Sequence, residues 1–260
     1  MTRALVLRTA GTNCDRETVE ALRLAGARPE LVHVRTLIAE PQRLDDCALA
    51  VFPGGFSYGD DIAAGRVLGF EVRHHLAAGF DAFVDRGGFV LGVCNGFQVL
   101  VDTGLLEPPQ QRGARRRFTL ASNASARFEC RWVTLRAEPS ACAWLAPGEL
   151  WPMPVAHAEG RFVVRAPEVL AELEAAGQVA LRYVAEDGSP PAYPANPNGS
   201  LSDVAGVCDP TGRVLGLMPH PERNLTAWHH PRWTRLGPRA EGEGLSFYRR
   251  LVEAAAAAPV

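Results

Sequence analysis

The sequence predicts an α/β fold, in which one domain over residues 1–260 holds a largely parallel central sheet flanked by helices. Two observations predict it. Short apolar segments alternate with segments of helical spacing over roughly the first 105 residues, an order typical of parallel strands joined by right-handed crossovers. Beyond that point helices become scarce and strands follow one another, which predicts that mixed strands in the C-terminal half complete the same domain.

The N-terminal elements follow from apolar runs and from the residues that stop them. The apolar segment 3–8 predicts a strand, and the helical spacing of 17–26 predicts a helix that closes at Gly26. Strands are also predicted over 30–34 and 47–52, the second of which ends at a Pro-Gly-Gly turn.

A long amphipathic stretch, residues 60–88, predicts helix that is weakened at Gly65, Gly69 and Gly79, because glycine lowers helix stability. The apolar segment 89–93 comes next and predicts a strand buried on both faces.

The second half of the chain is richer in strands. Apolar patterns predict them over 127–136, 151–164, 179–185, 204–209 and 213–218. Helices are expected over 167–177 and about 245–257. The stretch of about 224–244 is predicted to be a loop, and its many Trp, His and Pro residues leave open whether it docks a partner or only covers the surface.

Composition excludes several classes of function. With 47% hydrophobic and 22% charged residues the chain is typical of globular proteins. A net charge of -2 gives no electrostatic reason to expect nucleic acid, and the basic run 115–117 is predicted to be a solvated loop face. No apolar run reaches the roughly 18 residues that a membrane span needs, so we expect no membrane partner and a cytoplasmic location.

The spacing of the cysteines and the absence of lysine exclude several kinds of site. Six cysteines are scattered without a C-x-x-C pair, which predicts neither a metal site nor a disulfide framework. All 27 basic residues are arginine. Walker-type nucleotide binding and Schiff-base catalysis, which both need lysine, are therefore excluded for this chain.

Cys94 occupies an unusual position between the strand over 89–93 and a following helix. Gly92 and Gly96 flank it, so strand, G-x-C-x-G and helix follow in the order of a nucleophile elbow. The helix would aim its N-terminal amides at the sulfur and favour the thiolate. The alternative is an inert buried cysteine, but the paired glycines favour a nucleophile.

A cysteine nucleophile needs a base that a third group orients. Among the seven histidines, His220 has the strongest case, because it follows the apolar strand over 213–218 between two prolines. Glu222 lies two residues on, where an extended backbone points both side chains to the same side. A simple strand-end turn is the alternative, and a zinc deaminase would need a P-C-x-x-C motif that is missing.

The motif GVCNGFQ, together with PGG upstream and MPHPE downstream, resembles the class I glutamine amidotransferase family. Further motifs occur in one order along roughly residues 4–223: GTNCDRE, FPGGFSYGDDIAAG, NASARFECRW, VAHAEGRF, NPNGS and GLMPHPER. Together they resemble the branch formed by the glutaminase subunits of phosphoribosylformylglycinamidine synthase.

The resemblance implies a role for each matching residue. It makes Cys94 the nucleophile, His220 the base and Glu222 its orienting group. It places oxyanion donors at Gly54, Gly55 and the amide of Asn95, and glutamine contacts at Gln98, His157, Glu159 and Gly160.

The resemblance also implies the reaction. Glutamine would be hydrolysed to glutamate and ammonia, and a large synthetase subunit would use the ammonia to convert formylglycinamide ribonucleotide to formylglycinamidine ribonucleotide. ATP and magnesium are expected on that synthetase and no cofactor on this chain, and a small accessory subunit is expected in the complex. Two alternatives stay open: a glutaminase subunit of another amidotransferase, or a non-enzymatic redox or regulatory protein with an elbow cysteine.

Overall fold

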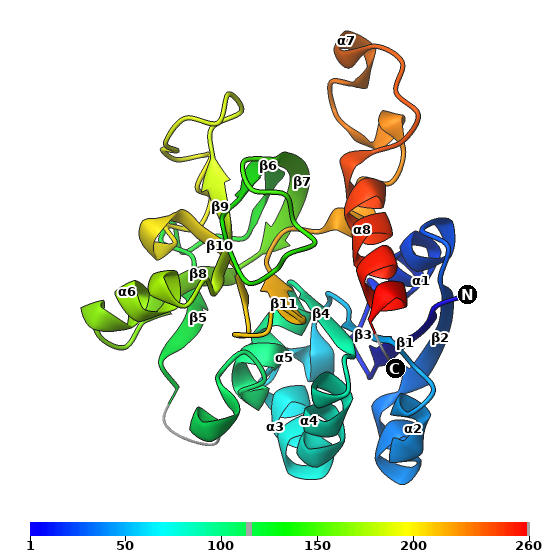
Figure 1. Cartoon of the computed structure of the whole chain (residues 1–260). Helices are drawn as coiled ribbons and strands as arrows, with labels where there is room; N and C mark the ends of the chain where they lie inside the picture. The colour runs from blue at the N-terminus through cyan, green and yellow to red at the C-terminus, as the bar shows by residue number, and fades with distance from the viewer. Residues whose placement is uncertain (113–115, 259–260) are drawn as a thin grey trace.

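A nine-stranded mixed sheet forms the centre of the computed structural model, which describes residues 1–112 and 116–258 (Figure 1). Its strand order is β2-β1-β3-β4-β11-β10-β9-β6-β7. The strands are β1 (Arg3–Arg8), β2 (Arg28–His33), β3 (Leu49–Phe52), β4 (Phe89–Val93), β6 (Glu129–Ala137), β7 (Leu150–His157), β9 (Val179–Val184), β10 (Val204–Cys208) and β11 (Val214–Leu217). A separate antiparallel pair consists of β5 (Phe118–Ser122) and β8 (Glu159–Val164).

The sheet has a parallel half and an antiparallel half. Strands β2, β1, β3, β4 and β11 pair in parallel, whereas β10, β9, β6 and β7 pair antiparallel. Every residue of β3, β4 and β11 is buried, as expected for parallel strands covered on both faces. The predicted fold class is confirmed. Strand β11 nevertheless joins the parallel half beside β4, a position that the order along the chain does not indicate.

Eight α-helices are found in the described part of the chain: α1 (Asp15–Leu24), α2 (Val34–Ala39), α3 (Arg66–His75), α4 (Ala77–Asp85), α5 (Asn95–Thr103), α6 (Pro167–Ala175), α7 (Trp233–Leu236) and α8 (Glu243–Ala257). The crossover from β1 to β2 runs one way along the sheet, and the crossover from β3 to β4 runs the other way. Right-handed connections therefore place α1 on the opposite face from α3 and α4. Strand order reverses between β1 and β3, which is where ligands bind in such sheets.

Helices α5 and α8 cover the sheet by close packing. Gly216 of β11 leaves room for the ring of Phe97 of α5, since a Cβ at Gly216 would lie 2.1 Å from that ring. On the other side, Phe247 of α8 packs edge-on against Trp151 of β7, with ring centroids 5.7 Å apart. Figure 1 shows α8 beside α1.

Several predicted elements differ from the structure. Residues 60–88 hold two helices, α3 and α4, which break at Leu76, and the first begins only at Arg66. The segment before α3 has positive φ at Tyr58, Asp60 and Ile62, which prevents a regular helix there. The region 151–164, predicted to form strand, holds β7 and β8, and β8 pairs with β5 outside the main sheet.

The basic run at 115–117 was predicted to be solvated. Arg115 lies outside the described residues, but Arg116 pairs with the buried Asp102, and Arg117 pairs with Glu107 at 2.7 Å. The prediction is wrong for these two arginines, because they neutralise carboxylates that the fold has buried.

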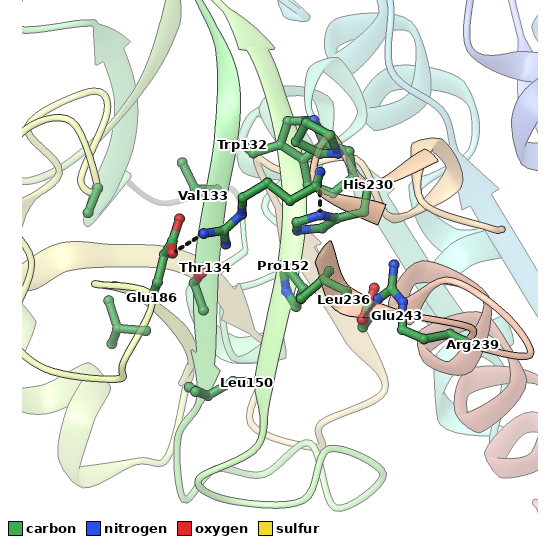
Figure 2. A pocket seen from close by; sticks show the side chains of 14 residues that line it. Trp132, Val133, Thr134, Leu150, Pro152, Glu186, His230, Leu236, Arg239 and Glu243 are labelled. Atoms are coloured by element: carbon green, nitrogen blue, oxygen red, sulfur yellow. Dashed lines mark hydrogen bonds and ion pairs between the residues drawn. The ribbon is translucent and has the colours of Figure 1, made fainter. Parts of the chain in front are cut away.

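The late segment 224–244, expected to be a loop, holds the 3-10 turn Ala227–His229, the short helix α7 and the first two residues of α8. It borders a groove of about 480 Å³ on the outer strands β6 and β7. The His230 ring packs against Trp132 (Figure 2), and the two ring centroids lie 4.8 Å apart. Arg232 pairs with Glu186 at 2.9 Å. None of the predicted catalytic residues lines this groove.

Among the residues that the structure describes, no helix combines the length and the apolar character needed to cross a bilayer.

Candidate active site

Cys94 lies at a strained turn between β4 and α5. Its φ of 52° and ψ of -107° are unusual for a residue with a side chain, and such conformations cluster at functional sites. The two flanking glycines make the turn possible. A Cβ at Gly96 would lie 1.9 Å from the carbonyl oxygen of Phe52, and one at Gly92 would lie 2.6 Å from the carbonyl oxygen of Gly96. The predicted nucleophile elbow is confirmed as a backbone geometry.

Strand β11 brings the base to this turn. The amide of Cys94 donates to the carbonyl oxygen of Leu217, the last residue of β11, at 2.8 Å. His220 follows three residues later, and its own amide donates to the carbonyl oxygen of Pro154 at 2.8 Å. Nδ1 of His220 lies 2.6 Å from Oε1 of Glu222. The His-Glu pair therefore forms as the spacing predicts.

The surroundings of His220 favour its protonated form. The side chains of His220 and Glu222 are 2% and 0% exposed. Burial lowers the pKa of His220, but the negative charges of Glu222 and Cys94 outweigh it and raise the pKa well above its ordinary value. Nε2 of His220 is buried and has no hydrogen-bond partner among the described residues. This arrangement suits a thiolate paired with an imidazolium.

The predicted oxyanion donors lie beside these groups. Helix α5 begins at Asn95, so its first amides have no partner within the helix. Gly54 lies against the base: a Cβ there would lie 2.7 Å from Cε1 of His220. Gly55 has φ of +145° and lies against residues 11–13 of the loop after β1. The amide of Ser57 donates to Oδ1 of Asn95 at 3.2 Å, which ties this loop to the elbow.

Gln98 connects the elbow helix to the segment that follows β7. Nδ2 of Asn95 donates to Oε1 of Gln98 at 2.9 Å and to Oδ1 of Asp60 at 3.0 Å. Nε2 of Gln98 donates to the carbonyl oxygen of Glu159 at 2.6 Å. Two of the predicted glutamine contacts, Gln98 and Glu159, are therefore adjacent. Asp60 joins them, and nothing in its local sequence pattern indicated this.

His157 lies in a fixed, buried position at the end of β7. Its Nδ1 is 3.1 Å from Oδ1 of Asn123, and the residue is 3% exposed. Gly160 permits this packing, because a Cβ there would lie 2.6 Å from Cε1 of His157. Burial, and then the nearby His220, lower the pKa of His157 to about 4.

This low pKa predicts an acid-dependent loss of stability. The unfolded chain protonates His157 near its ordinary pKa of 6.5, whereas the folded chain does so only near 4. As the pH falls through this window the unfolded state binds the extra proton, so the folded state loses stability. Between about pH 7 and about pH 5, urea unfolding should show the wild type losing about 2 kcal/mol more than the His157→Gln variant. Equal losses in the two proteins would contradict the low pKa.

Cys14 and Arg223 also lie at the site, and the sequence assigned neither of them a role. Sγ of the buried Cys14 lies 4.0 Å from Nδ1 of His220 and accepts from Nη2 of Arg223 at 3.1 Å. Burial raises the pKa of Cys14. The sequence singled out Cys14 only as part of the motif GTNCDRE, because no local sequence pattern predicts that the loop after β1 lies against His220.

Cys14, His220 and Glu222 are the one group of potential metal ligands found among the described residues, with ligand atoms within 4.8 Å of one another. Their contacts disfavour a metal. Nδ1 of His220 is already held by Glu222, and a cation, Arg223, contacts the sulfur of Cys14. The group is better described as support for the base than as a metal centre.

Comparison with known proteins agrees with this geometry. A family model described as a CobB/CobQ-like glutamine amidotransferase domain matches residues 1–253. A protein of Dehalococcoides mccartyi named phosphoribosylformylglycinamidine synthase subunit PurQ is 46% identical over 255 residues, which cover 96% of each chain. A protein of the same name from Thermomicrobium roseum is 44% identical over 226 residues, covering 85% of this chain and 87% of that one.

A solved structure has the same fold over almost the whole chain. It is described as PurLQS from Thermotoga maritima and matches with a TM-score of 0.70 and 31% identity, covering 98% of this chain and 97% of that one. Since the family model and the relatives extend over nearly the entire sequence, the chain belongs to the glutamine amidotransferase family, in the branch of the PurQ subunits of phosphoribosylformylglycinamidine synthase.

Proposed function

We propose that this chain is the glutaminase subunit of a phosphoribosylformylglycinamidine synthase and that Cys94, His220 and Glu222 release ammonia from glutamine. The observation that carries the proposal is the pairing of adjacent strands: β4 ends at the strained Cys94, and β11 leads to the His220–Glu222 pair, held at 2.6 Å. The names of the relatives supply the synthase that the released ammonia would serve.

The first half of the reaction uses the thiolate and the imidazolium. The sulfur of Cys94 attacks the carboxamide carbon of glutamine, and the developing oxyanion receives hydrogen bonds from the amide of Asn95 and from the Gly54–Gly55 segment. The C–N bond then breaks while Nε2 of His220 donates its proton to the leaving nitrogen. Ammonia departs, and a glutamyl thioester on Cys94 remains.

In the second half, neutral His220 takes a proton from water, and the resulting hydroxide attacks the thioester. Cys94 leaves as thiolate and glutamate is released. Glu222 holds the imidazole in position and stabilises its charged form in both halves. Gln98 and Glu159 lie where they can contact the amino-acid end of glutamine, through their side chains or the backbone between them.

The ammonia released by this chain is used as a substrate by a separate subunit. The synthetase that converts formylglycinamide ribonucleotide would hold ATP and magnesium, because this chain has neither lysine nor a nucleotide-binding loop. A small accessory subunit is part of the same proposal. A cytoplasmic location stays a prediction.

A glutaminase subunit of another amidotransferase is the second candidate. It would share the triad, but the motifs NASARFECRW and NPNGS are not expected in it. In this structure those motifs form the wall of the site: Asn123 contacts His157, and Nδ2 of Asn198 donates to the carbonyl oxygen of Gly160 at 2.8 Å. The wall favours the purine-pathway member.

The isolated chain should hydrolyse glutamine slowly, and the synthetase subunit should activate it. The loop after β3 contains Gly54 and Gly55, and its residues Tyr58, Asp60 and Ile62 have positive φ. The side chains of Phe56 and Ile62 in this loop are exposed and could contact a partner. A peptide flip at Gly54–Gly55 would misalign an oxyanion donor, which costs about 100-fold to 1,000-fold in rate. Glutamate release at saturating glutamine, without and with the synthetase and its ligands, should differ by that factor.

The same experiment tests the function. Formation of formylglycinamidine ribonucleotide from glutamine by the assembled complex is expected, together with glutamate. A complex that releases glutamate but aminates a different acceptor would favour the second candidate. Equal glutamate release with and without the synthetase would contradict activation by the synthetase. The assignment of Cys94, His220 and Glu222 as the catalytic triad would not be affected by that result.

A further inference from the structure

The carboxylate of Asp60 lies at the site, but the proposed mechanism gives it no role. Its Oδ1 accepts a hydrogen bond from Nδ2 of Asn95 at 3.0 Å, and Asn95 directly follows the nucleophile Cys94. The same Nδ2 donates to Oε1 of Gln98 at 2.9 Å. Asp60 therefore shares a hydrogen-bond donor with a residue that is proposed to contact glutamine.

The backbone around Asp60 is held in an unusual conformation. Asp60 has a φ of 55°, and Tyr58 and Ile62 also have positive φ. Contacts to other elements hold this loop, because the amide of Tyr58 donates to the carbonyl oxygen of Ala10 at 2.8 Å and its hydroxyl donates to Oε2 of Glu71 at 2.6 Å. Strained backbone of this kind persists only where its surroundings fix it, and it clusters at sites that bind a ligand.

The half-buried carboxylate of Asp60 has no counter-charge in the described part of the chain. Burial raises the pKa of Asp60, and the negative charge of Glu159 adds to this rise, whereas hydrogen bonds from Gly65 and Asn95 oppose it. No arginine or histidine among the described residues pairs with this carboxylate. A cationic group on a ligand would compensate a charge that the fold has partly removed from water.

Gln98 presents a second acceptor beside this carboxylate. Nε2 of Gln98 donates to the carbonyl oxygen of Glu159 at 2.6 Å, so Oε1 must be the atom that faces Asn95. An amide oxygen has two lone pairs and can accept a further hydrogen bond. An ammonium group has three N–H donors, which suit a carboxylate and an amide oxygen in one place.

We propose that Asp60 binds the α-ammonium group of glutamine and so restricts the site to amides that carry this charge; this rests on the proposed glutaminase function. The length of glutamine fits. Its α-nitrogen lies roughly 5 Å from the carboxamide carbon when the side chain is extended. Gln98 follows Cys94 by four residues, which is about 6 Å along a helix. Asp60 forms no covalent bond and transfers no proton.

The test compares two substrates in the complex assembled with the synthetase subunit. Ammonia release is measured from glutamine and from 4-carbamoylbutyrate, which is glutamine without the α-amino group. Asp60→Asn keeps an oxygen for Asn95 and removes only the charge. It should lower kcat/KM for glutamine about 100-fold, mainly through KM, because a hydrogen bond between two charged groups loses one charge. The value for 4-carbamoylbutyrate should be unchanged.

Asp61→Asn is the matched control, because Asp61 is the next residue, is exposed, and undergoes the same change of charge. Both of its kcat/KM values should equal those of the wild type. Asp60→Gly is a second variant that the fold should accept, since glycine adopts the positive φ of this position without strain. It should show the same selective loss for glutamine.

A carboxylate that only ties the loop to the elbow would give a different result, because both substrates would then lose activity to the same extent. Equal losses for the two substrates, or an unchanged KM for glutamine in folded Asp60→Asn, would overturn the proposal. The wild type separates this inference from the proposed function. If the wild-type complex releases no ammonia from glutamine, both fail, whereas if it does and the Asp60 variants match it, only the role of Asp60 fails.

Discussion

His220→Ala is expected to lower glutamine hydrolysis on the order of 10,000-fold or more, because nucleophile and base act as one unit. The variant loses both the proton that the leaving nitrogen needs and the cation that stabilises the Cys94 thiolate. Gln98 and Glu159, which are proposed to contact the bound glutamine, are unchanged in this variant. The loss of activity should therefore appear in kcat more than in KM. The measurement is glutamate release by the assembled complex at saturating glutamine.

Glu222→Ala is the informative companion of this variant. The carboxylate acts only through His220, so its removal should be less damaging than removal of the base, by a factor of about 50. Since the charge of Glu222 helps to raise the pKa of His220, the variant should also lose its imidazolium at lower pH. The alkaline limb of its kcat/KM profile should therefore move toward acid.

Circular dichroism would establish that both variants are folded. If folded Glu222→Ala is at least as inactive as His220→Ala, Glu222 does more than orient the base, and the assignment of roles within the triad is wrong.

Local sequence patterns predicted the parts of the site that depend on local backbone geometry. The glycines around Cys94 predicted the elbow, because a Cβ at Gly96 would meet the carbonyl oxygen of Phe52 and a Cβ at Gly92 would meet that of Gly96. The two-residue spacing of His220 and Glu222 predicted their contact in the same way. Both predictions needed no knowledge of the distant parts of the chain.

Long-range contacts escaped the same reasoning. Nothing local to the strand at 214–217 indicates that it pairs with β4 as well as with β10, yet its pairing with β4 brings His220 to Cys94. Cys14 reaches the base from the loop after β1 for the same reason. Strand β5 was missed because FTLAS has only one buried residue, Phe118, and is held by its pairing with β8.

The strained segment after β3 was missed for another reason. Residues 57–65 have a composition compatible with the start of a helix, but their backbone follows contacts to other elements. Asn95 binds both the amide of Ser57 and the side chain of Asp60, and Gly65 lies against Val99 and Gln98 of α5. Helix propensity is a weak preference, and tertiary contacts override it here.

The central claim is that Cys94 releases ammonia for a reaction carried out by another subunit, and a change of nitrogen source tests it most directly. In the complex assembled with Cys94→Ala, synthesis of formylglycinamidine ribonucleotide from glutamine should be lost, because no thioester can form. Synthesis from added ammonium salt should continue at the wild-type rate, because the synthetase is unchanged. If both nitrogen sources fail equally in a folded complex, or if glutamine still supports synthesis, Cys94 is not the residue that supplies ammonia.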